Sequence, residues 1–202
     1  MVDIDSGLPM PVHVQWVAFF KQWLKNPLRM ASVVPSGRQL AQMMVAAMPQ
    51  DARHVVELGA GTGAITEALL RHGVAPTQLL AIEMNATLHD LLLRRFPETH
   101  VLCADARHLS ELVERSGAFA SGRADVVLSS LGLLAMPAEL QREILAAAFA
   151  VLRPGGVFVQ YTYGMRSPLD DGVREQLGLR CTRFGQAWRN LPPARVFVYS
   201  RD

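Results

Sequence analysis

The sequence has few cysteines, few aromatic residues and almost no lysine. Of its 202 residues, two are cysteine, 7% are aromatic, and only Lys21 and Lys25 are lysine. Cys103 and Cys181 have no second thiol close in sequence and no histidine at ligand spacing, which argues against a disulfide framework and a zinc site. We therefore expect no bound metal and a reducing, cytoplasmic environment.

Long hydrophobic runs are also missing. No uncharged stretch reaches the roughly 18 apolar residues of a membrane-spanning helix, and Asp3 and Asp5 stand where a secretory signal would carry positive charge. Half of the residues are nevertheless hydrophobic, which is ample for the core of one globular domain. The chain is thus predicted to be neither exported nor integral to a membrane, although contact with one side of a membrane stays open.

Acidic residues are absent from two segments of the chain. Residues 10–49 carry four basic side chains and residues 176–201 carry five arginines, with no acid in either segment. The sequence between them is net acidic, so that the formal net charge is only +2. A near-neutral total therefore conceals two basic segments beside an acidic centre.

From residue 54 onward, strand-like and helix-like segments alternate, which is typical of a parallel sheet with crossover helices. The expected strands are 54–58, 78–83, 100–104, 124–129, 157–162, 179–184 and 195–200. The expected helices are 62–72, 85–96, 110–115, 137–152, which Gly155 and Gly156 would close, and one that begins at Ser167 with a capping-box pattern completed by Asp170. The last two strands have no helix between them and should form an antiparallel pair at the sheet edge.

Two further helices are predicted ahead of the sheet, over residues 12–25 and 36–48. The first presents an aromatic-rich face with lysines opposite, and Asn26-Pro27 ends it. Such a helix either packs on the domain or lies in a membrane interface, and the pattern alone does not decide between the two.

The strongest local signal is the segment ELGAGTG at residues 57–63, where the first expected strand meets a helix. Its glycines Gly59, Gly61 and Gly63 allow a tight turn and the close approach of a ligand, and a helix N-terminus offers free N–H donors. Gly59 and Gly61 with Ala64 also fit the dinucleotide fingerprint. The glycines alone therefore leave an adenosylmethionine site, a dinucleotide site and a plain tight turn open.

Three carboxylates follow successive expected strands. Glu57 would order the glycine turn and meet the cationic amino-acid end of a methyl donor, whereas it would repel a pyrophosphate. Glu83 suits the two hydroxyls of a ribose in either kind of site. Asp105 would accept a hydrogen bond from an adenine amine, with the backbone of Ala106 donating to the ring and Met84 packing on its face. Each alone is equally a solvated turn or helix cap, but together they favour a methyl-donor site.

These residues resemble the class I methyltransferases that use S-adenosylmethionine. Further segments resemble the bacterial phospholipid N-methyltransferases, namely residues 20–27 (FKQWLKNP), 34–37 (VPSG), 129–137 (SSLGLLAMP), 160–164 (QYTYG) and 189–194 (RNLPPA). The resemblance implies a Rossmann-like α/β fold with a seven-stranded, mostly parallel sheet, an antiparallel last strand and an N-terminal amphipathic helical extension. It also implies methylation of the phosphatidylethanolamine head group, and of its mono- and dimethylated forms, toward phosphatidylcholine.

The resemblance divides the chain into a helical extension, residues 1–50, and an S-adenosylmethionine-binding catalytic domain, residues 51–202. It also favours membrane contact for the first helix. The contacting side chains would be Trp16, Phe19, Phe20, Trp23, Lys21 and Lys25. We then expect a cytoplasmic enzyme bound peripherally to the inner face of the bacterial cytoplasmic membrane. Its partners would be the anionic membrane surface and the phospholipid substrate, with no nucleic acid and no obligate protein partner.

The expected reaction is a single in-line displacement of a sulfonium methyl group by a neutral amine, helped by positioning and desolvation. Tyr163 is the first candidate to contact the head group, and Arg189 and Asn190 are candidates to hold the lipid phosphate. Ser129 and Thr162 are further candidates near the transferred methyl group. The plainer alternative for Tyr163 is an aromatic residue that packs on the sheet at a strand end, and the plainer alternative for Arg189 is a solvent-exposed surface residue.

One residue departs from the resembling segments: Gly132 stands where a proline is expected, which leaves the substrate range open. The chain also lacks the Asn/Asp-Pro-Pro-aromatic signature of enzymes that methylate planar amino groups of bases. Two alternatives remain. One is a ribosomal RNA adenine N6-methyltransferase whose basic C-terminal segment binds phosphates, and the other is a non-catalytic peripheral lipid-binding protein with a relic donor site.

Overall fold

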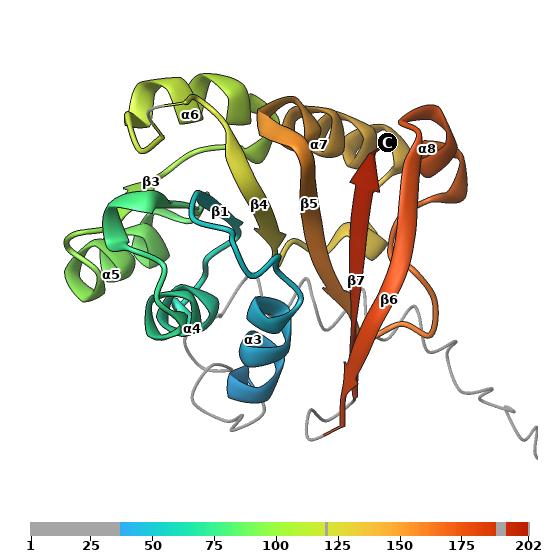
Figure 1. Cartoon of the computed structure of the whole chain (residues 1–202), viewed down its shortest axis with the longest axis horizontal. Coiled ribbons are helices and arrows are strands. Elements are labelled where there is room, and N and C mark those ends of the chain that lie inside the picture. Colours follow the sequence, from blue (N-terminus) through green and yellow to red (C-terminus); the bar gives the residue numbers. More distant parts are fainter. Residues whose placement is uncertain (1–36, 120, 189–192, 202) are drawn as a thin grey trace, which may run out of the picture.

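A seven-stranded sheet lies between two layers of helices in the computed structural model, which describes residues 37–119, 121–188 and 193–201 (Figure 1). The strands are β1 (Val55–Leu58), β2 (Leu79–Ile82), β3 (His100–Leu102), β4 (Ala124–Ser129), β5 (Leu152–Thr162), β6 (Leu179–Ala187) and β7 (Ala194–Arg201). The helices are α3 (Gly37–Ala46), α4 (Ala64–His72), α5 (Ala86–Arg95), α6 (Leu109–Ser116), α7 (Ala138–Val151) and α8 (Asp171–Gln176). Three short 3-10 turns are η1 (Pro76–Gln78), η2 (Ala106–His108) and η3 (Leu133–Ala135).

The strand order is β3-β2-β1-β4-β5-β7-β6, and β7 runs antiparallel to both of its neighbours. The predicted mostly parallel α/β sheet with an antiparallel last strand is thus confirmed. The chain moves outward from β1 to β3 and then returns to place β4 on the other side of β1. Open α/β sheets bind their ligands at the carboxyl edge, at the point where the strand order reverses. Here that point lies between β1 and β4.

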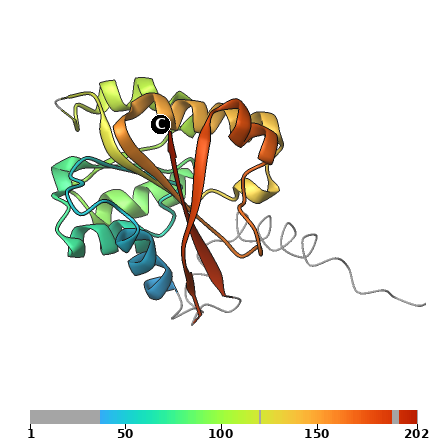
Figure 2. The same cartoon turned by 45° about the vertical axis from the view of Figure 1, so that its right-hand side comes forward.

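Helices cover both faces of the sheet (Figure 2), and alternate strand residues pack against opposite layers. In β4, Val126 and Leu128 join the apolar cluster that contains α3 and α4, whereas Val127 joins the cluster that contains α6, α7 and α8. Because both faces are covered, β1, β2 and β4 are buried along their whole length and consist largely of apolar residues.

Two predicted boundaries are wrong. Gly155 and Gly156 do not close a helix, since α7 ends at Val151 and both glycines lie inside β5. A Cβ at Gly156 would lie 3.0 Å from the backbone oxygens of Arg153 and Asp125, so glycine permits a close strand approach at this position. Ser167 does not cap the next helix either. Its hydroxyl lies 2.8 Å from that of Tyr199, and the N-cap of α8 is Asp170.

The N-terminal predictions fall partly outside the described residues. The expected helix over 12–25 and all of its proposed membrane contacts lie there, as do Arg189 and Asn190. The second expected helix is present as α3, whose Leu40, Met44 and Val45 pack on the sheet. No helix within the described residues is long and apolar enough to cross a membrane.

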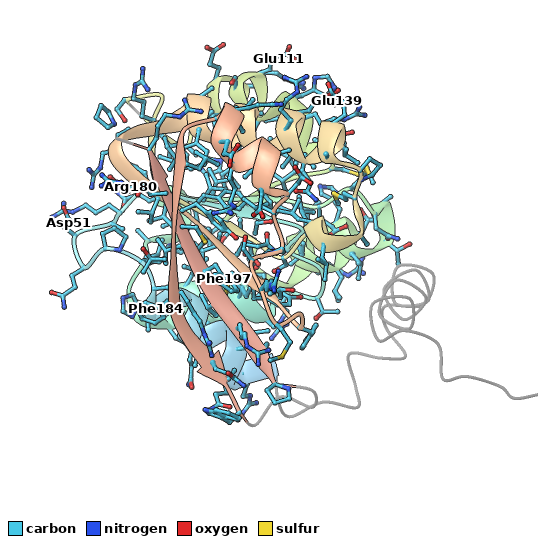
Figure 3. The ribbon with its side chains drawn as sticks, turned by 90° about the vertical axis from the view of Figure 1, so that its right-hand side faces the viewer. Asp51, Glu111, Glu139, Arg180, Phe184 and Phe197 are labelled. Carbon is cyan, nitrogen blue, oxygen red and sulfur yellow. The ribbon has the colours of Figure 1, made fainter. Side chains whose placement is uncertain are left out.

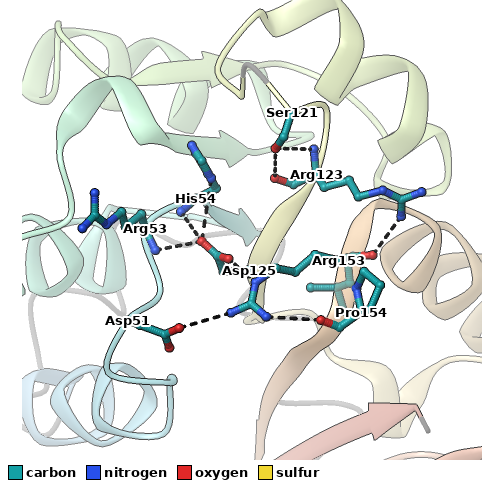
Figure 4. Close-up of polar contacts among 9 residues, drawn as sticks. Asp51, Arg53, His54, Ser121, Arg123, Asp125, Arg153 and Pro154 are labelled. Carbon is teal, nitrogen blue, oxygen red and sulfur yellow. Dashed lines mark hydrogen bonds and ion pairs between the residues drawn. The ribbon is translucent and has the colours of Figure 1, made fainter.

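Asp125 and Arg153 anchor a network of ion pairs and hydrogen bonds at the amino edge of the sheet (Figure 4). Asp125, at the start of β4, accepts hydrogen bonds of 2.8 Å from the backbone N–H groups of Arg53 and His54, and Arg153 of β5 pairs with it. Burial opposes ionisation of Asp125, but these donors outweigh burial and lower the pKa of its carboxyl. Arg153 also lies 3.6 Å from Asp51. The network ties β4 and β5 together on the edge away from the strand-end carboxylates.

Candidate functional site

The predicted donor-site residues meet at the carboxyl edge of the sheet. β1, β2, β3 and β4 are parallel, and their last residues Leu58, Ile82, Leu102 and Ser129 lie in neighbouring register. Glu57, Glu83 and Asp105 therefore come from three different loops or strand ends to the same edge. The structure thus brings together the three carboxylates that the sequence singled out.

The glycine loop turns between β1 and α4. Gly59, Gly61 and Gly63 have φ angles of 71°, 58° and 85°, which side-chain-bearing residues adopt at a cost. The loop is also tightly packed, because a Cβ at Gly63 would lie 2.4 Å from the Phe96 ring and one at Gly59 would lie 3.0 Å from Leu131. At Gly63, packing therefore excludes a side chain in addition to the backbone conformation, whereas at Gly59 the end of the Leu131 side chain would have to shift by a few tenths of an ångström.

Glu57 is a buried carboxyl group with one partnered oxygen. Only 1% of the residue is exposed, the hydroxyl of Thr66 donates to its Oε2 at 2.6 Å, and its Oε1 is buried without a partner. Burial raises the pKa of this carboxyl to about 8, with the Thr66 hydrogen bonds opposing the rise and the nearby charge of Glu83 adding to it. A cation beside Oε1 would both supply the missing partner and favour the ionised form. The site therefore fits the cationic amino-acid end of the expected donor.

Glu83 bridges the glycine loop and the start of α5. Its Oε2 accepts the N–H of Gly61 at 2.8 Å, and its Oε1 accepts the N–H of Asn85 at 2.9 Å. Asn85 in turn caps α5 by accepting the N–H of Leu88. Each carboxylate oxygen keeps a second acceptor position, so the geometry is compatible with the predicted contact to ribose hydroxyls.

Asp105 caps η2 beyond the end of β3. Its Oδ1 accepts the backbone N–H of Arg107 and its Oδ2 lies 2.8 Å from the same guanidinium, which lowers the pKa of the carboxyl. Ala106 is buried beside it, whereas Met84 is 71% exposed. Met84 is therefore not ordinary core, and its side chain is accessible to a ligand at this edge.

The candidates on the acceptor side separate onto two faces of the sheet. Ser129 and Thr162 are buried, and their hydroxyls accept the N–H groups of Leu131 at 3.3 Å and Gly164 at 2.9 Å. Tyr163 follows Thr162 and packs on the opposite, α3-bearing face, where its ring meets that of Tyr161 edge-on at 5.6 Å. The structure does not bring Tyr163 together with the two hydroxyls, and its role at the head group stays a prediction.

Sequence reasoning missed several side chains that hold this edge together. Gln160 donates to Leu131 O at 2.9 Å, Gln141 donates to Leu133 O at 2.9 Å, and Arg195 donates to Gly164 O at 3.0 Å. Thr66, the partner of Glu57, was missed as well. The available signal was a polar residue inside an apolar strand run, as at Gln160 after Val157-Phe158-Val159 and at Arg195 before Val196-Phe197-Val198.

Known proteins match both the sequence and the fold of this chain. A family model described as a methyltransferase domain matches residues 55–156. The ornithine lipid N-methyltransferase of Singulisphaera acidiphila is 33% identical over 148 residues, which cover 71% of this chain and 76% of that protein.

Solved structures of other enzymes share the fold. A 1,6-didemethyltoxoflavin-N1-methyltransferase from Burkholderia thailandensis, with bound S-adenosylhomocysteine, has a TM-score of 0.64 at 17% identity and covers 98% of this chain and 94% of its own. An O-methyltransferase from Bacillus cereus, also with the bound product, has a TM-score of 0.62 at 15% identity with the same coverage. At these identities the likeness concerns the architecture.

Proposed function

The chain belongs to the class I methyltransferases that depend on S-adenosylmethionine, and we propose that its acceptor is the amine of a membrane lipid. The observation that carries this proposal is the extended similarity to an enzyme named ornithine lipid N-methyltransferase. Phosphatidylethanolamine is the acceptor implied by the sequence resemblance, and ornithine lipid is the second candidate. Both carry a primary amine on a lipid whose head group also bears an anion.

On the donor side, the proposed roles follow the contacts of the carboxyl edge. When bound, S-adenosylmethionine supplies a methyl group on a positively charged sulfur. Glu57 would face its cationic end through Oε1, Glu83 would hold the ribose while it fixes Gly61, and Asp105 would accept from the adenine amine. Because Arg107 keeps Asp105 ionised, Asp105 remains an acceptor at neutral pH.

Exposed apolar side chains at the same edge support access to a lipid surface. Met84, Leu134, Met165 and Trp188 are between 48% and 77% exposed and lie on the segments after β2, β4, β5 and β6. β6 runs in the direction of β5, since both are antiparallel to β7, so all four segments leave the sheet at one edge. Large apolar groups exposed together suit the membrane interface.

The acceptor is tested with labelled S-adenosylmethionine and four substrates in separate tubes: vesicles of phosphatidylethanolamine, ornithine lipid or phosphatidylcholine, and unmodified ribosomal RNA. We expect label in a lipid that carries a free amine and none in phosphatidylcholine, whose nitrogen is already fully methylated. Label in RNA alone, or in none of the tubes, would overturn the lipid proposal.

Membrane contact is tested by sedimentation with anionic vesicles. We compare the full chain with a chain lacking residues 1–25 and with a Met165→Ser, Trp188→Ser double variant. Loss of bound protein in the shortened chain supports the predicted interfacial helix, and loss in the double variant supports contact through the carboxyl edge. Unchanged binding in both would remove these surfaces from membrane contact.

A further inference from the structure

A row of buried polar side chains crosses the acceptor side of the sheet. Ser129 of β4 pairs in register with Gln160 of β5, and Thr162 of β5 pairs with Arg195 of β7. Alternation along the strands places all four on the face that carries α7 and α8. They lie where β4 and β5 end and β7 begins, next to the loops that contain Leu131 and Gly164.

Gln160 contributes a buried oxygen that lacks a donor. The residue is 1% exposed, and its Nε2 donates to the carbonyls of Leu131 at 2.9 Å and Tyr161 at 2.8 Å. Two carbonyl acceptors fix the orientation of the amide, because only its NH₂ group can donate to them. Oε1 is therefore the atom that is buried without a partner. An unpaired buried acceptor is costly and calls for a donor from a ligand or water.

Arg195 contributes a buried cation that lacks an anion. The residue is 9% exposed, its Nη1 donates to Gly164 O, and its Nε is buried without a partner. Within the part of the chain that the structure describes, Arg195 forms no ion pair with a carboxylate. Arg153 at the opposite edge shows the usual arrangement, since it pairs with Asp125 and Asp51 (Figure 4). Buried charges are normally paired, so Arg195 indicates a site for an anion.

The two incomplete groups are close neighbours on one face. Gln160 pairs directly with Phe197, which Figure 3 labels on β7, and Arg195 is two residues from Phe197 along the same strand. Such diagonal neighbours lie about 7–8 Å apart at their Cα atoms. The two side chains thus start from neighbouring positions on one face, and this Cα spacing is comparable with the separation of the two charges in a small zwitterionic head group.

We propose that Gln160 and Arg195 form the head-group site for the methyl acceptor. Gln160 Oε1 accepts an N–H of the amine, and the Arg195 guanidinium binds the neighbouring anion, a phosphodiester or a carboxylate. This inference rests on the proposed lipid methyltransferase function and adds what the acceptor must contain. An amine without a nearby anion would leave Arg195 buried and unpaired, and it would be a poor substrate for that reason.

The test compares two acceptors in vesicles: a zwitterionic lipid that the enzyme methylates, and a diacyl lipid with a primary amine but no anion. We take the ratio of kcat/KM for the zwitterionic lipid to kcat/KM for the lipid without an anion. Arg195→Met is expected to lower this ratio about ten-fold or more, because only the zwitterionic lipid loses a partner for its anion. Gln160→Met is expected to raise KM for both acceptors. Arg201→Met, at the other end of β7 and exposed, is the matched control and should leave the ratio unchanged.

A purely structural role of Arg195 would lower kcat/KM for both acceptors alike, and an unchanged ratio in Arg195→Met would therefore overturn the proposal. The affinity for S-adenosylhomocysteine, measured by calorimetry, reports whether each variant is folded. Should Arg195→Met fail to fold, Arg195→Lys is used. It keeps the charge but loses the planar fork, and we expect the ratio to fall about three-fold. An unchanged ratio there would also count against the site.

Failure of the lipid function and failure of this site give different results. If the unaltered enzyme methylates no lipid, the proposed function is wrong. The site is then tested by calorimetry in the presence of S-adenosylhomocysteine, with glycerophosphoethanolamine and an Nα-acyl ornithine as probes. Binding of either probe that Arg195→Met weakens about ten-fold supports the site, and the preferred probe identifies the anion. No binding of either probe to the unaltered enzyme would overturn it.

Discussion

The two halves of the carboxyl edge are built on different principles. On the donor half, around β1 to β3, carboxylates accept hydrogen bonds from the backbone or from side chains, as Glu83 does from Gly61 and Asn85. On the acceptor half, around β4, β5 and β7, amide and guanidinium groups donate to loop carbonyls, as Gln160 does to Leu131 and Arg195 does to Gly164. The first arrangement presents carboxyl oxygens at the edge, and the second presents a cation and an amide oxygen.

This difference matches the methyl donor and the proposed lipid acceptor. A donor that carries a positive sulfonium and an ammonium group suits a surface of carboxylates, whereas an amine that must lose its proton before it attacks is better placed away from them. The halves meet where Leu131, held by Gln160, contacts Gly59. We therefore expect substitutions in one half to act mainly on one ligand.

The largest effect should come from a single methyl group on the donor half. Gly63→Ala forces a residue with a Cβ to adopt a φ of 85°, and that Cβ would lie 2.4 Å from the Phe96 ring. We expect the free energy of unfolding to fall by about 3 kcal/mol, from backbone strain and overpacking combined. Gly73→Ala is the control, since its φ of 106° is strained but no atom lies within 4 Å, and it should cost about 1 kcal/mol. Equal losses in denaturant titrations would contradict the packing argument.

The acceptor half should depend on buried amides to a similar degree. Gln141 donates to Leu133 O and Met136 O and accepts the N–H of Asp170. Gln141→Leu strands these backbone groups, so we expect a loss of about 2–3 kcal/mol in unfolding free energy. KM for the acceptor should rise while the dissociation constant of S-adenosylhomocysteine stays the same. Gln176→Leu, on the exposed surface of α8, is the control. Weaker binding of S-adenosylhomocysteine by Gln141→Leu would contradict the expectation that this half acts mainly on the acceptor.

Removal of the Glu83 side chain tests whether the donor half sets the affinity for S-adenosylmethionine. Glu83→Ala removes the acceptor for the Gly61 and Asn85 N–H groups, and we expect donor binding to weaken by about 1–3 kcal/mol. Calorimetry measures this directly, with exposed Glu98→Ala as the control. Unaltered donor affinity would remove Glu83 from the site.

The pKa of Glu57 links the donor half to pH. Because the folded pKa of about 8 exceeds the ordinary value of 4.5, the folded protein binds a proton that the unfolded chain has released between these pH values. The stability of the ligand-free protein should therefore fall as pH rises from 4.5 to about 8. A cationic donor favours the ionised form, so its binding should release protons below pH 8.

Calorimetry in two buffers of different ionisation enthalpy counts the released protons. Glu57→Gln removes the titrating group, and both the release and the fall in stability should shrink. Identical proton release in the variant would show that another group titrates.

The smallest expected effect concerns the loop of the acceptor half. Gly132 is the centre of a tight turn in which Leu133 N–H donates to Leu131 O at 2.8 Å, with φ −75° and ψ 55°. Proline adopts this φ readily, so Gly132→Pro should raise the free energy of unfolding by about 0.5 kcal/mol through the unfolded state. A loss of stability in thermal unfolding would show that the loop needs the freedom of glycine.

The sequence predicted the donor half better than the acceptor half for a physical reason. The glycine loop, Glu83 and Asp105 follow the ends of predicted strands, and the structure places them there, at the carboxyl edge. Gln160 and Arg195 reach carbonyls 29 and 31 residues away, and only the assembled sheet brings those partners near. The same applies to Ser167, whose hydroxyl lies against Tyr199, 32 residues on, instead of capping a helix.

The position of β7 also orders the assembly of the two halves during synthesis. β7 is the last strand in chain order, yet it fills the gap between β5 and β6 and is the neighbour that joins β6 to the sheet. On a ribosome the segment that contains β1, β2 and β3 emerges first, whereas the acceptor row lacks Arg195 until residues 194–201 have been made. The residues proposed to hold the methyl donor have therefore all been synthesised before Arg195, the residue proposed to select the acceptor.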